Sequence, residues 1–144
     1  MAKKLKEILL IDDSRSDNFI HERRIRNMDI TDRIIIKSNG REAIDYLDTV
    51  LEDDNYPSPD LIFLDINMPV MDGWEFLEEY EKLVEEKKAR IILAMLTTST
   101  APQDKERAKD FNYLSTFITK PLTEQDLKAI LSEHFPELGL REEK

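Results

Sequence analysis

Short apolar runs and longer amphipathic stretches alternate along the chain, and this alternation predicts its secondary structure. Runs of only a few branched or aromatic residues are typical of strands that are buried on both faces of a parallel sheet. Four such runs lie at residues 8–11, 34–36, 61–64 and 91–96. A fifth, weaker run at residues 116–119 is rich in β-forming residues and stops before Pro121.

Between the strands, apolar residues recur three and four positions apart, which is the spacing of one face of a helix. The stretches with this helical character lie at residues 14–28, 43–51, 76–84, 102–111 and 123–135. The first is less regular than the others, and its apolar residues are Phe19, Ile20, Ile25 and Met28. The fourth is mostly charged, so we expect a weakly buried and mobile helix there.

The order of elements is therefore strand then helix, five times over. Strands that alternate with helices form right-handed crossovers and a parallel sheet covered on both faces, which is a doubly wound α/β fold. The second strand ends in a plain turn at residues 37–40, as expected at a sheet edge. The 144 residues fit one domain, expected at 5–136 and followed by a charged tail at 137–144. The polar stretch 52–59 is expected to be a surface loop.

The amino-acid composition argues against several classes of function. Lys and Arg number 21 against 31 Asp and Glu, a net charge of −10, which disfavours nucleic acid and anionic membranes as partners. There is no cysteine and there are only two histidines, which excludes thiol chemistry and imidazole-rich zinc sites. No apolar run approaches membrane-spanning length and the N-terminus has no signal-peptide core, so we expect a cytoplasmic protein.

Polar residues follow four of the predicted strands: Asp12 and Asp13, then Asp65, Thr97 and Lys120. Because open α/β sheets bind ligands at the carboxyl ends of their strands, we expect these side chains to meet at one edge. Three carboxylates favour a hard cation, Mg²⁺ or Mn²⁺, and a lysine and a hydroxyl suit phosphoryl oxygens. Asp65 would then serve as a nucleophile.

Each of these residues also has an ordinary structural interpretation. Asp12 and Asp13 could begin a solvated helix, Thr97 could cap a helix, and Lys120 could lie on the surface. Their convergence from separate strands on one edge favours a shared site for a metal and an anion.

Four motifs in this order resemble the receiver domain of two-component response regulators, over essentially the whole chain. They lie at residues 11–13, 64–69 with 71–73, 96–97 and 119–121. The resemblance implies a flavodoxin-like (βα)₅ fold with strand order 2-1-3-4-5. It also implies a phosphorelay role in signal transduction.

The resemblance further implies the roles of the acidic residues. Asp65 would accept a phosphoryl group from a phosphohistidine. Asp13 and Asp65 would hold Mg²⁺ directly, with Asp12 assisting through water, and the backbone carbonyl of Asn67 would be a further ligand. Asn67 would also favour a short-lived phosphoaspartate, because an amide orients water without deprotonating it.

The same resemblance implies a switch. Lys120 would contact the acyl phosphate and form a cis bond to Pro121, and Thr97 would move toward the phosphate. Phe117, where many members of the family have tyrosine, would turn inward in response. Leu114 and Ser115 replace a common Gly-Ala pair before the fifth strand, which leaves the end of the preceding helix open.

The implied partners are proteins: a histidine kinase or histidine phosphotransfer protein, and a downstream target. After Pro121 there is room for one helix and a tail, so we expect the signal to leave through the domain's own surface. The expected output face combines the helix at 102–111, the strand bearing Phe117 and the helix at 123–135.

Two other functions remain as alternatives. A Mg²⁺-dependent aspartyl-phosphate hydrolase of the haloacid dehalogenase type would need a second aspartate two residues after its nucleophile, where this chain has Asn67. A degenerate receiver that acts only as a scaffold is disfavoured because Asp13, Asp65, Thr97 and Lys120 are all present.

We expect two further residues to have structural rather than functional roles. His21 lacks the context of a phosphohistidine and is expected to be a solvated side chain. Trp74, at a predicted helix start beside Gly73, is expected to belong to the core or to cover it.

Overall fold

The computed structural model describes residues 4–48, 59–66, 72–87, 92–97 and 114–136, together with residues 103, 106, 107 and 109. Within these residues the chain forms five strands and four helices. The strands are β1 (Leu5–Ile11), β2 (Thr31–Lys37), β3 (Leu61–Leu64), β4 (Ile92–Thr97) and β5 (Leu114–Thr119). The helices are α1 (Arg15–Met28), α2 (Gly40–Leu47), α3 (Gly73–Lys87) and α5 (Glu124–His134).

All strand pairs are parallel, and the strands lie in the order β2-β1-β3-β4-β5. In the central pairs, Ile11 is in register with both Lys37 of β2 and Leu64 of β3. The carboxyl ends of three strands therefore lie side by side. This arrangement confirms the predicted flavodoxin-like sheet and the position of the second strand at its edge.

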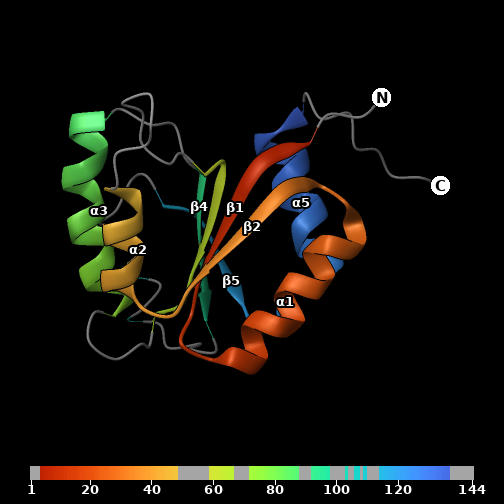
Figure 1. Ribbon diagram of the computed structural model, residues 1–144, viewed down its shortest axis with the longest axis horizontal. Helices are drawn as coiled ribbons and strands as arrows, with labels where there is room; N and C mark the ends of the chain where they lie inside the picture. The colour runs from red at the N-terminus through yellow and green to blue at the C-terminus, as the bar shows by residue number, and fades with distance from the viewer. Residues whose placement is uncertain are drawn as a thin grey trace.

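The helices cover the sheet in two layers, with α2 and α3 on one face and α1 and α5 on the other (Figure 1). Successive residues of a strand point to opposite faces, so each strand contributes to both layers. On β1, Leu9 and Ile11 pack in the α2–α3 core, and Ile8 and Leu10 pack in the α1–α5 core. Each of these side chains is fully or almost fully buried, which explains why the strands are continuous apolar runs.

Helix α1 buries two polar residues and leaves two of its four apolar residues exposed. Phe19 and Ile20 are 59% and 42% exposed, whereas the buried residues of the helix are Asn18, His21 and Ile25. The prediction that His21 is a solvated side chain is therefore wrong. The polar face turns inward because α1 lies over the segment that connects β5 to α5, where it finds polar partners.

The fifth strand is longer than its sequence pattern indicates. Leu114 and Ser115 are its first residues, and the register to β4 shifts between Leu93 and Ala94. The helix expected at 102–111 and the loop expected at 52–59 lie almost entirely outside the described residues. Among the helices that the structure does describe, none is both long and apolar enough to span a lipid bilayer.

Candidate functional site

Backbone hydrogen bonds across the sheet fix where the acidic residues stand. The N–H of Asp12 donates to the carbonyl of Lys37 at 3.1 Å, and the N–H of Asp65 donates to the carbonyl of Ile11 at 2.9 Å. Asp12 and Asp65 thus extend the parallel pairing by one step beyond β1 and β3. The central strands of the sheet therefore determine where their side chains begin.

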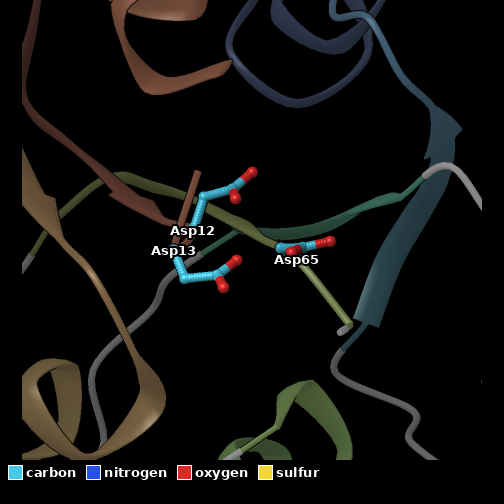
Figure 2. Close-up of side chains that lie close together, drawn as sticks. All are labelled: Asp12, Asp13 and Asp65. Carbon is cyan, nitrogen blue, oxygen red and sulfur yellow. The ribbon is translucent and has the colours of Figure 1, made fainter. Parts of the chain in front are cut away.

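Asp12, Asp13 and Asp65 form an acidic cluster at this end of the sheet (Figure 2). One carboxylate oxygen from each lies within 4.8 Å of the others. Asp12 and Asp65 are only 3% and 5% exposed, whereas Asp13 is exposed to solvent. Three negative charges held this closely repel one another, and a cation relieves that repulsion.

The two carboxylate oxygens of Asp12 have different partners. The Oδ1 atom accepts a hydrogen bond from the N–H of Ser14 at 2.9 Å. The Oδ2 atom is buried and lies 2.7 Å from the ammonium group of Lys120. The carboxylate oxygens that the three aspartates bring together are the type of ligand that a hard divalent ion prefers.

Lys120 is the cation that the structure does place at the cluster. Its Nζ atom lies 2.7 Å from Asp12 Oδ2, 2.8 Å from Asp17 Oδ2 and 3.7 Å from Asp65 Oδ1, and its side chain is only 9% exposed. Burial acts to lower the pKa of Lys120, but the contacts with Asp12 and Asp17 outweigh it and raise the pKa above its ordinary value. The ammonium group is therefore charged and fixed beside Asp65.

Helix α3 begins directly against the backbone of the cluster. The N–H of Gly73 donates to the carbonyl of Ile66 at 2.8 Å, and Asp72 and Glu75 exchange side-chain to backbone hydrogen bonds that cap the helix. Trp74 is only 4% exposed, which confirms its predicted place in the core, and Arg107 stacks on its ring at 4.8 Å.

The structure describes some of the other predicted site residues fully, some in part and one not at all. Thr97 is the last residue of β4 and pairs with Thr119, next to Lys120, but its side chain lies outside the described part of the chain. Asn67 lies outside it altogether. Phe117 is half-buried and packs against the α2–α3 core. The bond between Lys120 and Pro121 is cis, as the family resemblance led us to expect.

Sequence interpretation missed three residues of α1 that reach toward the site: Asp17, His21 and Arg24. Asp17 contacts Lys120, and His21 and Arg24 bind the backbone of Leu122. Their spacing of four and three residues places them on one helix face, which is the signal that could have revealed them.

A five-stranded parallel sheet of this order, with carboxylates and a lysine at its carboxyl ends, defines a flavodoxin-like protein with an acidic cluster beside a buried lysine. Residues 8–132 match the response regulator receiver domain, and the chain belongs to this family. The response regulator Rcp1 of Synechocystis is 33% identical over 122 residues, which cover 85% of this chain and 81% of Rcp1.

Solved structures agree with this assignment. A two-component response regulator from Cytophaga hutchinsonii has a TM-score of 0.81 at 28% identity, over 91% of this chain and 97% of that one. The Mn²⁺-bound form of Rcp1 has a TM-score of 0.71 at 31% identity, over 96% and 99%. Phosphorylated RcpA, a cyanobacterial phytochrome response regulator, has a TM-score of 0.71 at 30% identity, over 89% and 90%.

Proposed function

We propose that this protein is a phosphorylation switch in which Asp65 accepts a phosphoryl group from a phosphohistidine. The observation that carries the proposal is the buried carboxylate of Asp65 within an acidic cluster and 3.7 Å from the Lys120 ammonium. An Asp65 oxygen forms the new P–O bond while the P–N bond of the phosphohistidine breaks. The imidazole leaves with the bonding electron pair and takes up a proton.

The acidic cluster fits a divalent cation, Mg²⁺ or Mn²⁺. Asp13 and Asp65 would bind it directly, Asp12 through water, and the Asn67 carbonyl would be a further ligand. The bound ion would supply positive charge to the carboxylates and to the incoming phosphoryl oxygens. The Mn²⁺-bound form of Rcp1 supports a divalent ion in this family, and the close approach of Asp12, Asp13 and Asp65 supports it in this chain.

Lys120 would donate a hydrogen bond to a phosphoryl oxygen, because an ammonium group has three donors and stands beside the acceptor. The hydroxyl of Thr97 would move toward the phosphoryl group and bind one of its oxygens. This movement would open space for the half-buried ring of Phe117 to turn further inward. The resulting change in β5 and its surroundings would be recognised by a downstream protein. The phosphohistidine would belong to a histidine kinase or a histidine phosphotransfer protein.

We also propose that the receiver domain covers residues 5–136 and that it is not a free-standing phosphatase. The only catalysis expected is phosphorylation and dephosphorylation of its own aspartate. The amide at Asn67, where a dehalogenase-type hydrolase carries its general acid, supports this distinction. Hydrolysis of a generic phosphomonoester with many turnovers would favour the hydrolase instead.

The proposal is tested by incubating the protein with acetyl phosphate and Mg²⁺ and locating the added phosphoryl mass by mass spectrometry. Wild type should gain one phosphoryl group on Asp65, and Asp65→Asn should fold but gain none. Asp32→Asn, a matched change at an exposed aspartate of β2, should label like wild type. Full labelling of Asp65→Asn would refute the assignment.

A further inference from the structure

The ammonium group of Lys120 is held from the side of α1 as well as by the acidic cluster. Asp17 accepts a hydrogen bond from Nζ at 2.8 Å, close to the 2.7 Å of the contact with Asp12. The hydrogen bond to Lys120 keeps the pKa of Asp17 below its ordinary range. Asp12 and Asp17 thus engage two of the three N–H donors of the Lys120 ammonium. The third donor can face Asp65, whose Oδ1 atom lies 3.7 Å from Nζ.

The backbone that follows Lys120 is held by the same helix. The N–H of Leu122 donates to His21 Nε2 at 3.2 Å, and the carbonyl of Leu122 accepts a hydrogen bond from Arg24 Nη1 at 2.7 Å. Leu122 and His21 are 0% and 2% exposed, so water cannot replace these contacts. Both polar groups of one buried peptide residue are therefore satisfied by side chains of α1.

We infer that Asp17, His21 and Arg24, which we call the α1 clamp, are positioning residues that set where the Lys120 ammonium stands for phosphoryl transfer. The three side chains come from one face of α1 and grip the chain at Lys120 and again two residues later. Since α1 begins at Arg15, directly after the acidic cluster, the clamp fixes the lysine relative to the carboxylates.

A purely structural role would require only that the connection between β5 and α5 be anchored. The contact of Asp17 with the ammonium itself goes beyond this, because it orients the charged group rather than the backbone. His21 adds a requirement of its own, since it must be unprotonated at Nε2 to accept the Leu122 N–H. Burial, followed by the charge of Lys120, lowers the pKa of His21 and maintains this form.

The inference rests on the proposed phosphorylation of Asp65, and its test also measures the phosphoryl group added by acetyl phosphate. The rate of labelling at saturating acetyl phosphate and Mg²⁺ is measured for His21→Leu, His21→Gln and Arg24→Met. Misplacement by about 1 Å can cost about 100-fold in rate, so partial loosening should slow His21→Leu and Arg24→Met by roughly tenfold. His21→Gln, which restores an acceptor, should recover most of the rate.

The matched control is Arg23→Met. Arg23 is adjacent to Arg24, but it is exposed and stacks on Phe19 instead of binding Leu122. It should label at the wild-type rate. All rates are expressed per folded molecule, with the folded fraction from circular dichroism, so that loss of stability does not imitate loss of rate. If His21→Leu does not fold, Asp17→Asn at a partly exposed position takes its place and should also be slower at saturating donor.

A double-mutant cycle with Lys120→Met gives the decisive comparison. If the clamp acts through Lys120, Arg24→Met should have little further effect on the rate once the ammonium is gone. Equal slowing in both backgrounds, or a wild-type rate for every folded clamp variant, would overturn the inference while leaving Asp65 as the acceptor. Absence of labelling in the wild type would instead refute the proposed function.

Discussion

Gly73 lies so close to the backbone of Asp65 that a Cβ atom built on it would meet the Asp65 carbonyl oxygen at 2.6 Å. The same atom would stand 2.8 Å from the Cα of Ile66, so neither neighbour is a flexible side chain that could move aside. The absence of a side chain at Gly73 therefore allows the first turn of α3 to pack against the backbone of Asp65, the proposed phosphorylation site.

We predict that Gly73→Ala destabilises the protein by about 1–3 kcal/mol, the usual cost of forcing extra volume into a packed site. Because the strain falls on the backbone of Asp65, labelling by acetyl phosphate should also slow. Urea unfolding and the labelling rate measure the two effects. Glu81→Ala, at an exposed position of the same helix, should change neither, and a Gly73→Ala protein of wild-type stability would contradict the predicted clash.

Divalent metal should stabilise the protein by relieving repulsion in the acidic cluster. A ligand present at 100 times its dissociation constant adds about 2.7 kcal/mol, which is readily seen as a higher melting temperature. Removing one ligand with Asp13→Ala should abolish most of the rise with Mg²⁺. Asp32→Ala, outside the cluster, should keep it. An equal rise in Asp13→Ala would mean that the ion binds elsewhere.

The sequence alone predicted those site residues that directly follow a strand. Asp12, Asp13, Asp65 and Lys120 follow apolar runs, and the rule that parallel strands share a carboxyl edge brings them together. The spacing says nothing about distances, so the preference of Lys120 for Asp12 over Asp65 required the structure.

Helix α1 shows where sequence patterns fail. Of its apolar residues, Ile25 is buried as expected. Phe19 and Ile20 are exposed, and the polar His21 is buried instead. His21 is buried because its Nε2 atom accepts a hydrogen bond from the N–H of Leu122, about a hundred residues away in the sequence. A pattern confined to the helix contains no information about that partner.

The ion pair of Asp17 and Lys120 should appear in the pH dependence of stability. The folded-state pKa of Asp17 is lowered, so its contribution is present above its unfolded pKa of about 3.9 and is lost as the pH falls below that value. The melting-temperature difference between wild type and Asp17→Asn should therefore be constant from about pH 5 to 7 and shrink below about pH 4. A difference that persists unchanged in acid would show that the charge of Asp17 is not the cause.

At the opposite end of β1, Glu7 is only 3% exposed and is held by two partners. The hydroxyl of Tyr46 donates to its Oε2 atom at 2.6 Å, and Arg33 pairs with Oε1 at 2.7 Å. Tyr46→Phe should cost about 1–3 kcal/mol in urea unfolding, because a buried charged acceptor loses a donor. It should label Asp65 at the wild-type rate per folded molecule. A slower rate would mean that general stability governs labelling, which makes this variant a stability-matched control for the α1 clamp.

The proposed phosphorylation of Asp65 should alter the environment of Phe117 and of Trp74. Phe117 on β5 packs against the α2–α3 core, which also contains Trp74 at the start of α3. Trp74 is the only tryptophan of the chain and adjoins Gly73, so a ring movement at Phe117 or a shift of α3 should change its environment.

Beryllofluoride with Mg²⁺ imitates the acyl phosphate, and we expect it to change Trp74 fluorescence and to shift the NMR signals of β5 and Lys120. The ligand acts by favouring one of two conformations, so it can alter Phe117 only through a difference in affinity between them. Phe117→Ala should bind beryllofluoride but transmit less of the shift from Asp65 into β5. Asp65→Asn should show neither change. Shifts confined to the acidic cluster in wild type, with β5 signals unmoved, would contradict a switch that runs through Phe117.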